Sequence, residues 1–194
     1  MDIETLKDFA SRQRAIRLID TTRDVDDSLI EQILTVGTHA PSGGNRQPYR
    51  FIVIRDREIK RQLAEIYDTI GAQRYGNPES RTTWAKMPVL IAACSSPSSA
   101  PPGAAAPAAR AAMAASVLPA VENMLLAITA LGLGSVLTTL WKEEEAKVNQ
   151  LLGLPDGAEV HAILPIGWPD RKYGRNHRRP IAEVTYRDRW DNAW

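Results

Sequence analysis

Basic side chains gather in two short segments near opposite ends of the chain. The first segment carries Arg12, Arg14 and Arg17. The second carries Arg171, Lys172, Arg175, Arg178 and Arg179. A guanidinium group binds phosphate through two parallel hydrogen bonds, so two such clusters that meet in the fold could hold one phosphate. The alternative, and on composition alone the commoner outcome, is that both clusters are solvated surface charge.

A polar, glycine-containing segment lies between these clusters. It reads Ala40-Pro41-Ser42-Gly43-Gly44-Asn45-Arg46-Gln47-Pro48. Proline and paired glycines cannot continue a helix, so a loop is predicted. A loop of this kind can present amides and hydroxyls to the carbonyls and ring nitrogens of a planar cofactor. A plain solvent-facing connection is the alternative.

Motifs of hydrolases and metalloenzymes do not occur in the sequence. The histidines His39, His161 and His177 are far apart, and no HExxH, GxSxG or phosphate-binding GxxxxGK[ST] pattern is present. The single cysteine, Cys94, ends an apolar run and is interpreted as a small core residue. A hydrolase or metalloenzyme is therefore disfavoured.

Helical and strand patterns alternate along the chain, which favours an α/β or α+β layered domain. Apolar spacing predicts helices over residues 2–10, 28–39, 59–66, 111–131 and 143–152. Strands are predicted over residues 49–54, 89–94, 135–140 and 160–166, and residues 181–186 alternate like a strand. Ser28 and Glu31 have the spacing of a capping box. The Ala/Pro/Ser-rich residues 95–109 predict a mobile surface loop.

Composition indicates one globular domain over residues 1–194. The chain has 44% hydrophobic residues and a net charge of +1, which excludes wholesale disorder and argues against nucleic-acid binding. An uncharged stretch, Met124–Trp141, is interrupted by Gly132 and Gly134. A buried helix followed by a buried strand explains it better than a membrane span. The charged N-terminus has no apolar leader segment, so a soluble, cytoplasmic protein is expected.

Four motifs in register resemble the FMN-dependent nitroreductase superfamily. They are Gln13-Arg14-Ala15-Ile16-Arg17, the segment Ala40–Phe51, the helix from Asn123 that ends Leu131-Gly132-Leu133-Gly134, and Arg178-Arg179-Pro180-Ile181-Ala182-Glu183-Val184. Ile166-Gly167-Trp168-Pro169 also looks like a turn of that family. Each motif is weak alone, whereas the four together span nearly the whole chain.

The resemblance implies an α+β fold with a central mixed or antiparallel sheet flanked by helices. It also implies a homodimer that binds FMN at the subunit interface and exchanges a C-terminal tail, residues 180–194. NAD(P)H would reduce the flavin, and a nitroaromatic, quinone or enone would accept the electrons. The implied cofactor-binding residues are Arg14, Arg17, Pro41, Ser42, Asn45, Thr138, Thr139 and Arg178.

Roles for some of these residues follow from flavin chemistry. Arg178 matches the phosphate-binding arginine, and Arg17 is expected to tune the flavin electrostatically, because reduction places negative charge on its pyrimidine edge. No acid–base side chain is needed for hydride transfer. Gln13 and Ala15 depart from the family's arginine and serine. A specialised branch (dehalogenase or flavin-destructase type) and a flavin-storage protein remain as alternatives.

Overall fold

The computed structural model describes residues 2–75, 84–101, 103 and 105–194. Its chain forms two compact units. Ala15–Lys172 make up the larger unit, which contains the β-sheet and most of the helices. The residues up to Arg14, together with Tyr173–Trp194, make up the smaller unit.

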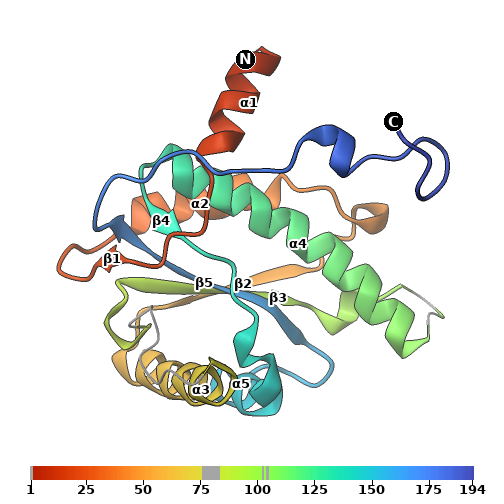
Figure 1. Ribbon diagram of the computed structural model, residues 1–194. Helices are drawn as coiled ribbons and strands as arrows, with labels where there is room; N and C mark the ends of the chain where they lie inside the picture. Colours follow the sequence, from red (N-terminus) through yellow and green to blue (C-terminus); the bar gives the residue numbers. More distant parts are fainter. Residues whose placement is uncertain (1, 76–83, 102, 104) are drawn as a thin grey trace. The chain divides into compact units, whose positions relative to one another are not determined.

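The larger unit is built on a five-stranded antiparallel sheet (Figure 1). Its strands are β1 (Ile19–Asp20), β2 (Tyr49–Ile54), β3 (Val89–Ser95), β4 (Gly134–Ser135) and β5 (Glu159–Pro169). The strand order is β1-β5-β3-β2, and β4 pairs with the end of β5. Strands β2 and β3 are confirmed almost residue for residue, because both are short apolar runs bounded by turn residues.

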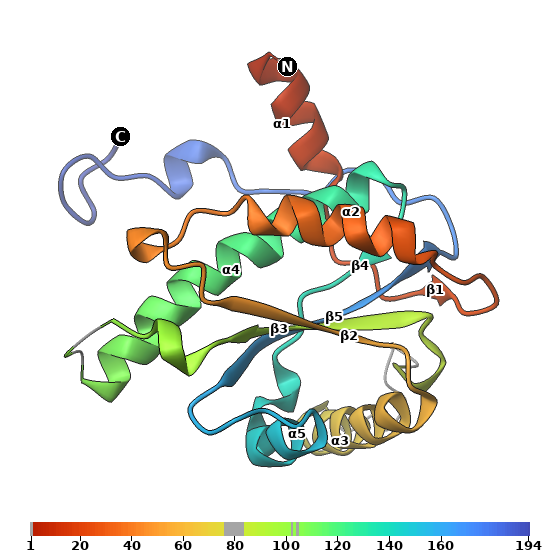
Figure 2. The ribbon, with the colours of Figure 1, turned by 180° about the vertical axis from the view of Figure 1, so that it is seen from behind.

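Helices cover both faces of this sheet. In Figures 1 and 2, α2 (Asp27–Thr38) and α4 (Ala106–Ala130) lie on one face, and α3 (Arg57–Tyr75) and α5 (Glu145–Leu151) lie on the other. Along β3, Val89, Ile91 and Ala93 pack in one core, whereas Leu90, Ala92 and Cys94 pack in the second. Such double burial explains why the strand is continuously apolar. The predicted α+β fold with an antiparallel sheet between helices is confirmed.

Helix α4 is apolar around most of its circumference. Among the described residues it is the helix that is long and apolar enough to cross a membrane, yet half of that window is buried in the fold, as in the core helix of a globular protein. It packs against α2, β3 and β5. The helix ends at Ala130, and Gly132 follows with a left-handed φ of 74°. The uncharged stretch is thus divided at the glycines, as predicted.

Three predicted boundaries are wrong. The strand over residues 135–140 is reduced to Gly134–Ser135, after which Leu140–Glu144 form a 3-10 helix. The capping box at Ser28 does not form, because α2 already begins at Asp27 and Asp26, another predicted N-cap candidate, occupies the cap position. Helix α4 begins at Ala106 and β3 extends to Ser95, so the loop predicted over residues 95–109 is shorter at both ends. Residues 102 and 104 lie outside the described part, and the loop's mobility stays a prediction.

The smaller unit contains one amphipathic helix and the C-terminal tail. Helix α1 (Ile3–Arg12) is capped by Asp2, whose Oδ1 accepts a hydrogen bond of 2.8 Å from the Thr5 amide. Residues 181–186, which alternate like a strand, instead contain a 3-10 turn at Ile181–Glu183. Tyr186 forms an isolated bridge to Ala193, and the alternation does not extend into a strand.

Candidate functional site

Parts of the two basic segments share the smaller unit, which contains Arg12, Arg14, Arg175, Arg178 and Arg179. Arg17, Arg171 and Lys172 belong to the larger unit. Asn176 joins the two segments, because its Nδ2 donates to the carbonyl oxygens of Ala10 (3.1 Å) and Gln13 (2.8 Å). Arg14 Nη1 donates to the carbonyl of Gly174 at 3.2 Å. Asn176, a residue that sequence reasoning did not single out, therefore fixes the C-terminal basic segment beside the end of α1.

Asp8 divides the basic residues of this unit into paired and unpaired ones. Arg12 and Arg175 both form ion pairs with Asp8, and their hydrogen bonds hold the pKa of that carboxyl below its usual value. Arg178 donates only to the carbonyl of His177, at 2.9 Å, and Arg14 lies 5.6 Å from the centre of the Tyr173 ring. Neither forms an ion pair with a described carboxylate. Both guanidinium groups are therefore available to an anionic ligand.

Arg17 belongs to the larger unit, where the chain is tied to β4. The amide of Ile16 donates to the carbonyl of Ser135 at 2.8 Å, while the Arg17 side chain is exposed and pairs with no described residue. The hydroxyl of Ser135 is buried and has no partner among the described residues. Arg17, an exposed cation, thus directly follows Ile16, which is bonded to β4. The same strand carries the unsatisfied Ser135 hydroxyl, and this combination suits the binding of a polar ligand. Sequence reasoning did not identify Ser135.

The loop before β2 is held in a defined conformation. Its Gly43 amide donates to Ser116 Oγ on α4 at 3.2 Å, and the Gln47 amide donates to Ser42 Oγ at 3.0 Å. Asn45 and Gln47 adopt left-handed φ angles of 52° and 49°, and their side chains are joined by a hydrogen bond of 3.2 Å. Pro41 and Asn45 are exposed, and Ser42 is half-buried. The loop is therefore polar and held in one conformation. Ser116, which holds it, was not identified from the sequence because it lies within an apolar helix.

The two candidate threonines differ in their availability. The hydroxyl and the amide of Thr138 both donate to the carbonyl of Ile163, the hydroxyl at 2.8 Å, and the side chain is buried. Thr139 is exposed, and its hydroxyl makes no capping hydrogen bond. The geometry therefore leaves Thr139 free to contact a ligand, while Thr138 holds its segment against β5.

The chain is similar to known proteins over most of its length. The model of the nitroreductase family matches residues 10–168. This chain belongs to the nitroreductase family. Two relatives are each 31% identical to it: a putative NADH dehydrogenase/NAD(P)H nitroreductase of Archaeoglobus fulgidus (96% of this chain, 99% of the relative) and an iodotyrosine deiodinase of Thermotoga neapolitana (90% and 95%). A putative nitroreductase of Desulfovibrio desulfuricans, solved in complex with FMN, is 27% identical, with a TM-score of 0.75 over 98% of this chain and 99% of that one.

Membership of this family suggests FMN as the ligand of the unpaired cations. A nitroreductase that holds FMN needs cations for the phosphate and polar groups for the ring. The smaller unit carries the unpaired guanidinium groups of Arg14 and Arg178. The larger unit, taken by itself, carries the fixed polar loop and the unsatisfied Ser135 hydroxyl. Each unit therefore offers side chains of a type that suits FMN.

Proposed function

We propose that this chain is an FMN-dependent oxidoreductase that takes electrons from NAD(P)H and passes them to a small organic acceptor such as a nitroaromatic, quinone or enone. The observation that carries the proposal is the division made by Asp8, which neutralises Arg12 and Arg175 and leaves Arg14 and Arg178 unpaired. The FMN-bound Desulfovibrio relative and the name of the Archaeoglobus relative support the cofactor and the nicotinamide donor.

Each residue has a distinct part in this proposal. Bound FMN supplies the hydride-accepting chemistry, so the protein needs no catalytic acid or base. Arg14 and Arg178 bind the phosphate, and Arg17 places positive charge beside the pyrimidine edge of the ring. Thr139 offers a hydroxyl to the ring.

A homodimer completes the proposed site. Pro41, Ser42 and Asn45 cover the ring of the other copy, and residues 180–194 embrace that copy. Exposed apolar side chains in the tail support this assembly, since Ile181 and Trp190 expose 70% and 81% of their surface.

The visible spectrum of the purified protein tests the cofactor, and anaerobic titration tests the reaction. We expect a flavin absorption band that bleaches on adding NADH or NADPH and returns on adding a nitroarene or quinone. Parallel titrations identify the preferred nucleotide. A colourless protein that does not take up added FMN contradicts the proposal, and a bound flavin that no nicotinamide bleaches indicates storage.

Reductive dehalogenation is the second candidate function. The Thermotoga deiodinase is as similar to this chain as the Archaeoglobus relative, at 31% identity over most of both chains. Iodide release from 3-iodotyrosine by the reduced protein, measured against a nitroarene as competing acceptor, distinguishes the two. Halide release that is much faster than nitroarene reduction would favour the dehalogenase.

A further inference from the structure

A basic cavity of about 550 Å³ lies in the larger unit at the end of the sheet where β2 ends and β3 begins. Five cationic side chains and one carboxylate line it. The cations are Arg23, Arg55, Arg57, Lys60 and Lys86, and the carboxylate is Asp24. None of the residues assigned to flavin binding lines this cavity. The loop before β2 lies at the opposite end of that strand, so the basic cavity needs an explanation of its own.

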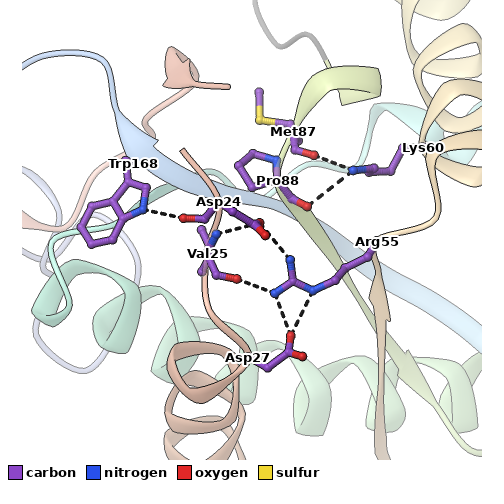
Figure 3. A network of polar contacts seen from close by, with 8 residues as sticks. All are labelled: Asp24, Val25, Asp27, Arg55, Lys60, Met87, Pro88 and Trp168. Carbon is purple, nitrogen blue, oxygen red and sulfur yellow. Dashed lines mark hydrogen bonds and ion pairs between the residues drawn. The ribbon is translucent and has the colours of Figure 1, made fainter. Parts of the chain in front are cut away.

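Arg55 lines the cavity and is held there by a network of hydrogen bonds (Figure 3). Its Nε and Nη2 donate to Asp27 Oδ1 at 3.0 and 2.7 Å, and its Nη1 donates to Asp24 Oδ1 at 3.0 Å. It also donates to the carbonyl of Val25. These bonds fix the turn before α2 against the end of β2. The bond from Nη1 also engages one oxygen of Asp24, the carboxylate that lines the cavity.

Lys60 is a buried cation whose hydrogen bonds go to backbone carbonyls. It is only 7% exposed, and its ammonium donates to the carbonyls of Met87 (2.8 Å) and Pro88 (3.5 Å), as Figure 3 shows. No described carboxylate forms an ion pair with it, and burial lowers its pKa. A buried charge that is bonded only to carbonyl dipoles is incompletely compensated. A neighbouring anion would therefore be stabilised by this lysine.

Three exposed cations surround the opening. Arg23 is held 4.0 Å above the ring of Trp168, whose Nε1 donates to the carbonyl of Asp24 at 2.9 Å. A stacked guanidinium keeps its N–H edge free for hydrogen bonds. Arg57 and Lys86 are exposed and form no ion pair with a described residue.

Acidic groups close to the cavity accept hydrogen bonds from neighbouring residues of α3. Asp56 Oδ1 accepts hydrogen bonds from the amides of Glu58 and Ile59, each at 2.9 Å. Glu58 pairs with Arg61, which together with Gln62 lowers the pKa of Glu58 to about 2. Four of the five cations that line the recess, all but Arg55, form no ion pair with a described carboxylate, and an excess of one sign of charge in a recess concentrates the electrostatic potential. The cavity is therefore a positive site, larger than a single phosphate requires.

We propose that the basic cavity binds a small ligand that carries two adjacent phosphate groups. Lys60 contacts the ligand from the inner wall, and Arg23 contacts it through the N–H edge of its stacked guanidinium group. Arg57 and Lys86 contact it at the opening. This site shares no residue with the proposed flavin site. The proposal of a phosphate site and the proposed function can therefore be contradicted separately.

Calorimetric titration of the FMN-saturated protein with inorganic pyrophosphate, at constant ionic strength, tests this proposal. We expect saturable binding of one pyrophosphate per chain. The double variant Arg57→Gln/Lys86→Gln should weaken it at least tenfold, because two charge-assisted contacts are lost. Arg57→Lys/Lys86→Arg should retain binding. A parallel titration with ADP shows whether a nucleotide or inorganic pyrophosphate is the better ligand.

Lys7→Gln/Lys147→Gln is the matched control, since it removes two exposed cations that pair with Glu4 and Glu144 outside the cavity. Its affinity for pyrophosphate should stay within twofold of the unsubstituted protein. Absence of saturable binding, or equal weakening in the control and the cavity variant, overturns the proposal.

Discussion

At the scale of single residues, one carboxylate determines which cations remain free in the smaller unit. Asp8 pairs with Arg12 and Arg175, so both guanidinium groups act inside the chain. Arg14 and Arg178 bond only to carbonyls or an aromatic ring. A count of basic residues in the sequence cannot make this distinction, because it depends on which side chains α1 presents to the C-terminal segment.

Replacing Arg178 with alanine should weaken FMN binding. The phosphate would lose a charged hydrogen-bond partner, worth about 1.5–3 kcal/mol, or roughly a 10- to 100-fold rise in Kd. Quenching of FMN fluorescence on titration with the apoprotein measures this Kd. Arg12→Ala is the control, because Arg12 pairs with Asp8. Equal affinity of Arg178→Ala and the unsubstituted protein would remove Arg178 from the site.

Replacing Arg17 with alanine should make the bound flavin harder to reduce. Loss of a nearby cation removes about 1–3 kcal/mol of favourable interaction with the charge gained on reduction. For a two-electron couple this lowers the midpoint potential by roughly 20–60 mV. Spectroelectrochemical titration measures the potential, and an unchanged value would refute the assigned role of Arg17.

His161 should make stability depend on pH. Its Nε2 lies 2.8 Å from Ser95 Oγ in the core, and burial lowers the pKa of His161 from its ordinary value of 6.5. The unfolded chain therefore takes up a proton at a higher pH than the folded chain does. This contribution to stability is complete above pH 6.5 and is lost as the pH falls towards the lowered pKa.

His161→Gln should consequently lose less stability than the unsubstituted protein between pH 8 and pH 5. Urea unfolding at both pH values measures the free energy of unfolding. His39→Gln, a change at an exposed histidine, should keep the full pH dependence. If His161→Gln keeps it as well, another group causes the acid sensitivity.

At the scale of elements, close helix packing depends on a glycine in α2. A Cβ added at Gly37 would lie 2.7 Å from Met124 Cγ on α4, closer than such atoms can approach. Met124 is fully buried and has little room to move. The small residue therefore sets the distance between the two helices that cover one face of the sheet.

Gly37→Ala should destabilise the fold by roughly 1–3 kcal/mol, the usual cost of overpacking a core. Gly71→Ala in α3 is the matched control, because its nearest neighbour would be Leu140 Cδ2 at 3.9 Å. The control should gain up to about 1 kcal/mol from helix propensity. Chemical denaturation compares the two variants, and equal effects would contradict the packing argument.

At the scale of the whole molecule, the C-terminal tail leaves large apolar side chains uncovered. Ile181, Val184 and Trp190 are all exposed, although such residues are usually buried. They lie beyond the residues matched by the family model, which end at 168. A second copy of the chain would cover them in the proposed assembly.

Ile181→Ser/Val184→Ser should therefore weaken the dimer and lower FMN affinity together. Sedimentation velocity at several protein concentrations measures the first effect, and flavin titration measures the second. Val53→Ser, which changes an exposed apolar residue on β2, should leave the association state unchanged. A protein that is monomeric before any substitution would contradict the assembly.

The sequence by itself predicts elements whose signals are local. Two strands coincide with apolar runs of the sequence, Tyr49–Ile54 and Val89–Ser95. The helix through Asn123 ends at the Leu131-Gly132 turn. Such signals depend on residues a few positions apart, which physical propensity links directly. The order of four short motifs was also enough to indicate the family.

Tertiary contacts decided the rest. Thr138 is held against Ile163 by hydrogen bonds, and Ile181–Glu183 form a 3-10 turn despite their strand-like alternation. Asp8 selects the free arginines, and Arg55 with Lys60 shapes the basic cavity from three distant segments. These features depend on charges and hydrogen bonds between residues far apart in the chain, and only the folded backbone determines which of them meet.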